Sequence, residues 1–199
     1  MAPKVEFLFD FGSPNAFFAR RVIPDIEQRT GVKFEPVPVL LGGIFKATGN
    51  QSPMQAYANV KNKLDYEMLE MERFRRRHHI DDFKMNPFFP VNTLNLMRMA
   101  VAAENEGLLP KLMDAMFRHM WVEPKKMDDP EVVKAALVES GFDPALYERA
   151  QEPSVKAKLI ANTESAVARG AFGIPTFFVG GEIYFGKDRL RDVEEAIRG

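Results

Sequence analysis

The order of apolar periodicities restricts the fold of this 199-residue chain more than any other feature. Residues 5–10 alternate like a buried strand, residues 14–30 repeat with helical spacing, and residues 33–39 alternate again. Helical patterns then fill the middle of the chain. Two short strand patterns at 176–179 and 182–185, separated by two glycines, precede a last helix. The order is therefore β-α-β, a block of helices, and then α-β-β-α.

That order predicts an α/β protein of thioredoxin topology, interrupted by a large all-helical insertion. We expect the first part of the thioredoxin-like domain at residues 1–42, the insertion at 43–152, and the second part of the domain at 153–199. Pro36 and Pro38 cannot donate to a strand ladder, so the second strand is predicted to lie at an edge of the sheet.

Several helices are expected inside the insertion. A long amphipathic pattern spans residues 57–79, and residues 109–120 keep the i, i+3, i+4, i+7 spacing of an amphipathic helix. Asn92 is predicted to cap a helix between these two, and Asp129 is predicted to open another after them. The insertion is therefore expected to contain no strand.

The charge balance and the absence of cysteine exclude several functional classes. With 27 basic and 28 acidic residues the net charge is -1, so no overall field favours nucleic acid or an anionic membrane. The chain has no cysteine, which excludes disulfides, thiolate metal ligands and dithiol exchange. No apolar run approaches the roughly 18 residues that span a bilayer, and the first residues show no leader pattern. We expect a cytoplasmic protein with no nucleic-acid or membrane partner.

A basic stretch at residues 73–79 has two alternative explanations. Glutamates between residues 67 and 72 and aspartates at 81–82 flank it, which favours a solvated helix face over a nucleic-acid site. Its adjacent histidines, His78 and His79, do not share a helix face, and no third ligand is apparent. We expect no metal site.

The first strand and the first helix meet at Phe-Asp-Phe-Gly-Ser-Pro, where Ser13 precedes Pro14. The simplest role for Ser13 is a helix cap. A nucleophilic serine is disfavoured, because Ser13 lies outside a G-x-S-x-G elbow and no histidine lies in a hydrolase motif. A hydroxyl at a helix start can instead donate to a thiolate brought by a ligand, whose pKa the helix lowers. Ile174-Pro175 would lie across from this helix start, in a setting that suits a cis bond.

Short motifs in a fixed order and spacing then identify a family resemblance. They are F-x-F-D-F-x-S-P at 7–14, I-F-x-x-x-G-N at 44–50, K-x-K-L-D-Y at 61–66, F-P at 89–90, G-A-F-G-I-P-T at 170–176 and F-G-x-D-R-L at 185–190. With these motifs the chain resembles the kappa-class glutathione transferases of the DsbA-like thioredoxin-fold superfamily. Among them it is most similar to the bacterial 2-hydroxychromene-2-carboxylate isomerases.

The resemblance implies glutathione as the cofactor, so that the reactive thiol comes from the ligand. By resemblance, Ser13 is the catalytic residue and holds the glutathione sulfur as a thiolate. Asp188 would pair with the ammonium of the ligand and Lys63 with a carboxylate. The glutathione-binding residues implied by the family are Ser13, Asn50, Lys63, Ile174, Pro175, Gly186, Lys187 and Asp188.

The resemblance also implies a reaction and a homodimer. The reaction converts 2-hydroxychromene-2-carboxylate, a small aromatic substrate, into trans-o-hydroxybenzylidenepyruvate by reversible addition of the thiolate. Lys46, Tyr66 and Arg98 are hypothesised to face this substrate. Asn15 stands where relatives often carry an aromatic residue, and Ala16 where many carry serine. Two alternatives stay open: a kappa-type transferase or peroxidase that consumes glutathione, and a non-catalytic thioredoxin-like binding module.

Overall fold

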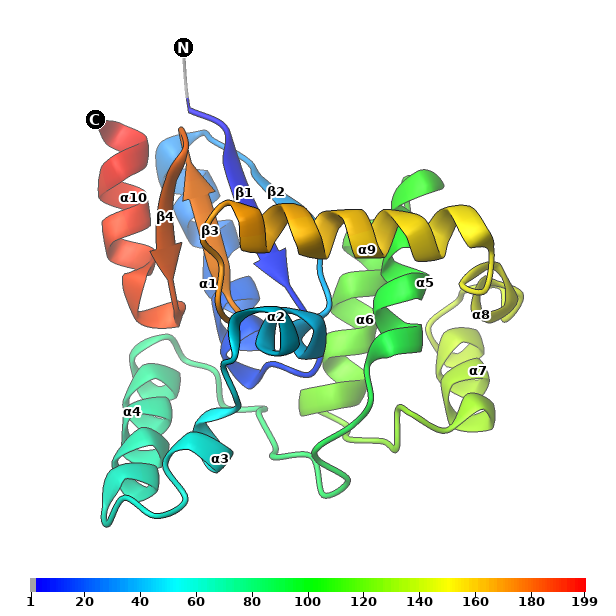
Figure 1. The fold of residues 1–199 in the computed structure, drawn as a ribbon, viewed down its shortest axis with the longest axis horizontal. Helices are drawn as coiled ribbons and strands as arrows, with labels where there is room; N and C mark the ends of the chain where they lie inside the picture. Colours follow the sequence, from blue (N-terminus) through cyan, green and yellow to red (C-terminus); the bar gives the residue numbers. More distant parts are fainter. Residues whose placement is uncertain (1–2) are drawn as a thin grey trace.

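A computed structural model describes residues 3–199, and its centre is a four-stranded sheet of order β2-β1-β3-β4 (Figure 1). β1 (Val5–Phe9) pairs in parallel with β2 (Phe34–Pro38) and antiparallel with β3 (Thr176–Val179). β3 also pairs antiparallel with β4 (Glu182–Phe185). The predicted strand order along the chain is confirmed, and β2 lies at an edge as its prolines require.

Helices lie on both faces of this sheet. α1 (Pro14–Thr30) lies behind the sheet and contacts α10 (Leu190–Arg198), which lies beside β4, and α9 (Pro153–Ala168) crosses in front of the sheet (Figure 1). The core between them is aromatic: the rings of Phe7 and Phe177 stack with centroids 5.4 Å apart. Aromatic pairs at this spacing add to the free energy gained from apolar burial. Burial of the apolar faces of the strands therefore holds the helices against the sheet.

The β3–β4 hairpin turns on two glycines, as predicted. Gly180 and Gly181 have φ angles of 57° and 103°, which L side chains rarely adopt. A two-residue hairpin turn requires such positive φ angles. The last helix was predicted to begin near Lys187, but residues Lys187–Arg189 form a 3-10 turn, η1, before α10.

The insertion is helical, as predicted, but one of its helices is shorter than the pattern suggests. The pattern over residues 57–79 is wrong as a single helix, because Asn62 takes a left-handed conformation with φ 69° and interrupts the chain there. Thr93 rather than Asn92 occupies the cap position of the next helix, although Asn92 accepts a hydrogen bond from the Leu94 amide at 3.1 Å. The helices are α2 (Leu41–Thr48), α3 (Pro53–Ala56), α4 (Lys63–Arg77), α5 (Leu94–Asn105), α6 (Leu109–Trp121), α7 (Pro130–Glu139) and α8 (Leu146–Arg149).

Close packing joins α2 to α9. A Cβ atom at Gly43 would lie 3.1 Å from Thr163 Cγ2, so the two helices meet where one has no side chain. The Thr163 hydroxyl accepts a hydrogen bond from the Leu40 amide at 3.0 Å, just before α2 begins. Asn162 donates to the Pro38 carbonyl at 3.0 Å, which ties α9 to the edge strand. These contacts fix α2 against α9 in front of the sheet.

None of the helices within residues 3–199 combines the length and the apolar character that crossing a bilayer demands.

Candidate functional site

Ser13 lies at the junction of β1 and α1, and its hydroxyl makes two hydrogen bonds there. Its Oγ accepts a hydrogen bond from the Ala16 amide at 3.1 Å, which confirms the predicted helix cap. The same hydroxyl donates to the Ile174 carbonyl at 3.2 Å, and Ser13 is 5% exposed. The helix start and the loop before Pro175 therefore face each other, as the topology predicted. The Ile174–Pro175 bond is cis in the structure.

Hydrogen bonds connect this junction to two other predicted segments. The Gly186 amide donates to the Pro175 carbonyl at 2.9 Å, and Asn50 Nδ2 donates to the Phe172 carbonyl at 2.7 Å. Gly173 separates these two contacts, and a Cβ atom there would lie 2.7 Å from the Phe185 ring. The structure thus gathers Ser13, Asn50, Ile174, Pro175 and Gly186 around one loop.

Lys187 and Asp188 follow directly, but they pair with each other. Lys187 is 4% exposed, and its ammonium lies 2.7 Å and 2.8 Å from the two carboxylate oxygens of Asp188. The ammonium also lies 4.9 Å from the centroid of the Phe74 ring, which brings η1 against α4. An ammonium group of a ligand at Asp188 would have to share the carboxylate with Lys187.

Lys63 lies at the first residue of α4, at the opposite end of that helix from Phe74. Its ammonium lies 2.6 Å from a carboxylate oxygen of Glu67, and this hydrogen bond raises the pKa of Lys63. The same ammonium lies 5.0 Å from the Tyr57 ring centroid and 5.8 Å from the Tyr66 ring centroid. Tyr66, a predicted substrate-side residue, therefore lies beside a predicted glutathione-side residue.

Lys46 and Arg98, the other two predicted substrate-side residues, lie elsewhere. Both line a cavity between α2, α5 and α9. None of the residues that line it belongs to the group around Ser13, and Tyr66 does not line it. The structure therefore divides the predicted substrate-side group in two.

The amino end of α1 leaves two polar groups available beside Ser13. Pro14 has no N–H, and the Ala16 amide is used by the cap. The Asn15 backbone N–H makes no hydrogen bond within residues 3–199. The side-chain oxygen Oδ1 of Asn15 is buried and has no partner in that range. The free Asn15 backbone N–H and the helix dipole favour an anion at this helix start, as expected for a thiolate. Asn15 Oδ1 is an acceptor, so it would need a donor of the ligand.

Asp10 is a further residue of this junction, and the sequence analysis assigned it no role. It is fully buried, and its Oδ1 accepts hydrogen bonds from the Gly12 amide at 2.8 Å and the Thr93 hydroxyl at 2.7 Å. Its Oδ2 accepts from the Leu41 amide at 2.8 Å. Burial raises the pKa of Asp10, and these hydrogen bonds oppose the rise. The carboxyl group connects the end of β1 to the starts of α2 and α5, three residues before Ser13.

His119, Glu123 and Glu139 place possible ligand atoms within 4.8 Å of one another, away from the His78-His79 pair considered above. Both carboxylates already face cations. Glu139 pairs with Lys125 and, at 3.2 Å, with Arg118, and Glu123 lies 3.7 Å from Arg118. The charges of this cluster are balanced by its own side chains, so we assign no metal to it.

Three arginines of the basic stretch pair with glutamates of the same helix, α4. Arg75 and Arg76 pair with Glu72 at 3.0 Å and 2.8 Å, and Arg73 pairs with Glu70. This pattern is that of a solvated helix face, the explanation that the flanking acids favoured.

The site therefore defines a thioredoxin-fold protein that has no redox cysteine and whose first helix begins with a hydroxyl beside a cis proline. Residues 4–198 match the family model of the DsbA-like thioredoxin domain. The chain belongs to this family.

Named relatives narrow the position of the chain within the family. It is 29% identical to glutathione S-transferase kappa 1 of Rattus norvegicus, covering 95% of this chain and 88% of the relative. It is 26% identical to the 2-hydroxychromene-2-carboxylate isomerase of Sphingobium xenophagum, covering 98% and 97%. A solved structure of a 2-hydroxychromene-2-carboxylate isomerase superimposes with a TM-score of 0.76 at 25% identity, covering 98% and 94%. These relatives support an enzyme of the glutathione-related branch.

Proposed function

We propose that the chain is a glutathione-dependent isomerase that converts 2-hydroxychromene-2-carboxylate into trans-o-hydroxybenzylidenepyruvate. The observation that supports this most is the Ser13 hydroxyl at the start of α1, beside the Ile174 carbonyl, in a chain without cysteine. Glutathione, when bound, supplies the thiolate that adds reversibly to the substrate. The name of the Sphingobium relative gives the substrate and the isomerase reaction, and the name of the rat relative gives glutathione.

Ser13 would hold the thiolate by exchanging one hydrogen bond for another. Its hydroxyl has one proton, which now goes to the Ile174 carbonyl at 3.2 Å. That distance is long for an O–H···O bond, whose usual range ends at about 3.0 Å. A hydrogen bond to an anion is stronger than one to a neutral carbonyl, so the Ser13 hydroxyl would donate to a thiolate beside it instead of to Ile174. The dipole of α1 favours the same anion.

The Ile174 carbonyl, once released by Ser13, would accept from a peptide N–H of the ligand. Asn50 would stabilise the loop before Pro175, because its side-chain amide already donates to the Phe172 carbonyl. Gly186 would stabilise the same loop through its backbone hydrogen bond to the Pro175 carbonyl. These contacts support a rigid backbone edge on which a short peptide can align.

Charged residues at the rim would bind the ends of the tripeptide. Lys63 would meet a carboxylate, and it would do so in competition with Glu67. Asp188 would meet the ammonium group, shared with Lys187. Tyr66, beside Lys63, is the substrate-side residue that we keep in this proposal. The homodimer and the cytoplasmic location stay predictions.

A transferase that consumes glutathione is the second candidate, favoured by the 29% identity to the rat kappa enzyme. The fate of glutathione separates the two. We would supply glutathione with 2-hydroxychromene-2-carboxylate, then with an electrophilic aryl halide, and follow free thiol in both reactions. Isomer formation with no loss of thiol supports the isomerase. Conversion of the aryl halide alone, with loss of thiol, would contradict the isomerase proposal and support the transferase.

A further inference from the structure

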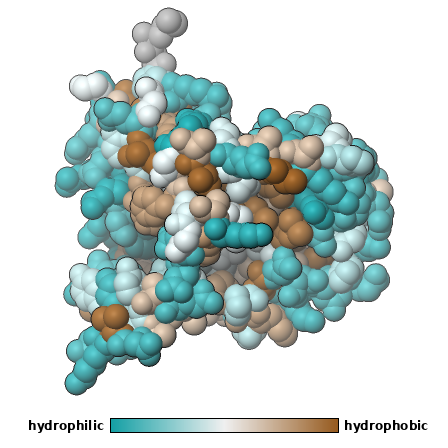
Figure 2. All heavy atoms as spheres, in the orientation of Figure 1, coloured by the Kyte–Doolittle hydropathy of each residue, from teal (hydrophilic) through white to brown (hydrophobic). Residues whose placement is uncertain are grey.

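The cavity between α2, α5 and α9 differs in charge from two other cavities of the described residues. Its volume is about 380 Å³, near the lower end of the range for small-molecule sites. Figure 2 shows hydrophobic residues on this face of the molecule, where the three helices meet. The walls are apolar and come from Leu40, Leu94, Leu159, Ile160 and Val167. Ile160 is 57% exposed, which leaves an apolar side chain at the mouth.

Three cations border these walls, one from each helix. They are Lys46, Arg98 and Lys156, and Glu164 is the one carboxylate among the lining residues. Within residues 3–199, neither lysine forms an ion pair or a side-chain hydrogen bond, and Arg98 donates only to the neutral Gln151 amide at 3.4 Å. The cavity therefore carries an excess of positive charge that the chain itself does not neutralise.

The charge of Lys156 interacts unfavourably with the dipole of its own helix, α9. It lies near the amino end of α9, where its backbone amide bonds to the Glu152 carbonyl just before the helix. Cations are destabilising near the positive end of a helix dipole and favourable near the other end. The helix and the lysine therefore add to each other's positive potential at the cavity. An anion there would relieve both.

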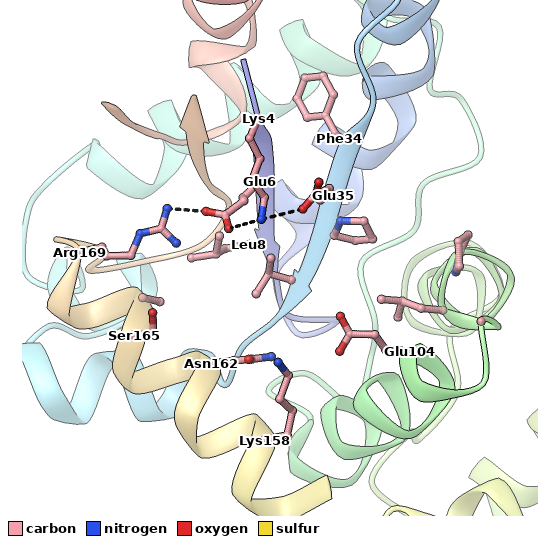
Figure 3. Close-up of a pocket in the computed structure, with 16 residues that line it drawn as sticks. Lys4, Glu6, Leu8, Phe34, Glu35, Glu104, Lys158, Asn162, Ser165 and Arg169 are labelled. Atoms are coloured by element: carbon pink, nitrogen blue, oxygen red, sulfur yellow. Dashed lines mark hydrogen bonds and ion pairs between the residues drawn. The ribbon is translucent and has the colours of Figure 1, made fainter. Parts of the chain in front are cut away.

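A second cavity contains charged side chains that pair with one another. It has a volume of about 630 Å³ and lies between α9 and the strands β1 and β2 (Figure 3). Lys4 lies 3.2 Å from Glu6 and 2.9 Å from Glu35, and Arg169 also pairs with Glu6. Its lining has equal numbers of cations and carboxylates. A third cavity, beside α6, is also balanced, with Arg149 paired to Glu106 at 2.7 Å.

We propose that the cavity between α2, α5 and α9 binds a small apolar carboxylate. Its carboxylate lies among Lys46, Arg98 and Lys156, and its hydrocarbon part packs on Leu94, Leu159 and Ile160. The excess charge selects the anion, and the apolar walls select the body. This site shares no lining residue with the group around Ser13, so it goes beyond the proposed isomerase and does not depend on glutathione.

The test uses 1-naphthoate as the probe and the full chain as the receptor, with calorimetry as the measurement. We expect binding of 1-naphthoate and much weaker binding of the neutral 1-naphthamide. Lys156→Gln and Arg98→Gln should each weaken the naphthoate by about tenfold, the loss expected for one charge-assisted hydrogen bond. Lys158→Gln is the matched control, because Lys158 lies on the same helix but lines the cavity of Figure 3.

A further variant keeps all three cations. Ile160→Glu places a carboxylate at the mouth and should also weaken the naphthoate. Saturating glutathione should leave the naphthoate affinity unchanged within about twofold. The proposal is overturned if no naphthoate binds at millimolar concentration, if the amide binds as well as the acid, or if Lys158→Gln weakens binding as much as Lys156→Gln. Competition by glutathione would overturn the separateness of the site.

Discussion

The two sites of this molecule treat their polar groups in opposite ways. At the start of α1, the polar groups of Asp10 and Ser13 are bound by the chain itself, mostly through residues far away in the sequence. In the cavity between α2, α5 and α9, Lys46, Arg98 and Lys156 make no ion pair within the described part of the chain. The first site is therefore held in its geometry by folding, while the second keeps three cations that no carboxylate of the described chain pairs.

The largest expected effect comes from removing the hydroxyl of the first site. Ser13→Ala should lower the turnover of the isomerase reaction by about 100-fold or more, the loss typical when one donor to a developing or bound anion is removed. Steady-state kinetics at saturating glutathione provide the measurement.

The chain offers a matched control for this variant. Ser52 also precedes a proline and caps a helix, and its hydroxyl accepts from the Gln55 amide at 3.3 Å. Ser52→Ala removes the same kind of cap from a short exposed helix, and it should leave turnover within about twofold. Equal losses from the two variants would mean that Ser13 acts only as a cap.

The next effect tests whether the hydrogen bonds of Asp10 stabilise the site at the start of α1. Asp10→Asn keeps the shape of the side chain but replaces one acceptor oxygen by a donor. Either the Leu41 amide or the Gly12 amide then loses its acceptor, which should destabilise the protein by about 1–3 kcal/mol. Urea unfolding provides the measurement. The control is Asp114→Asn, because the Asp114–Arg20 pair is exposed and should contribute less than about 1 kcal/mol.

The same aspartate predicts a dependence of stability on pH. Burial raises the pKa of Asp10, so the native chain keeps this proton at pH values where the unfolded chain has lost it. Its contribution to stability therefore falls as pH rises from the unfolded value of about 3.9 through the folded pKa. Asp10→Asn should remove this part of the pH profile. Identical slopes in the wild-type protein and the variant would show that Asp10 does not titrate in this way.

A smaller effect concerns His119, which has a hydrogen-bond partner at one ring nitrogen and none at the other. Its Nε2 lies 2.9 Å from the Ser140 hydroxyl, while its buried Nδ1 has no partner within residues 3–199. Burial lowers the pKa of His119, so the unfolded chain binds this proton first as pH falls. Stability should decline below about pH 6.5, and His119→Gln should flatten that decline. Replacement of the exposed His79 by Asn is the control and should leave the slope of His119 unchanged.

The sequence predicts this fold well where the signals are local. The Ser13 cap, the Gly180-Gly181 turn and the edge prolines each depend on neighbours a few residues away, and the structure confirms them. Asn62 shows the limit, because an apolar pattern continues through it while its backbone turns left-handed.

The missed residues depend on distant partners. Asp10 binds Leu41 and Thr93, which lie 31 and 83 positions away, so no local pattern announces its role. Lys156 looks like an ordinary solvated lysine until α2 and α5 are placed beside α9. Whether a charged side chain is paired depends on residues that are distant in the sequence, so the sequence alone does not predict it.

The most direct test of the central claim is a titration of the thiol of bound glutathione. Since the chain has no cysteine, thiolate absorbance in the complex reports the ligand alone. We predict a thiol pKa well below the ordinary value of about 8.5 in the wild-type complex, and a value closer to the ordinary one in Ser13→Ala. A thiol that titrates at its ordinary pKa in both proteins, with glutathione bound, would contradict the account.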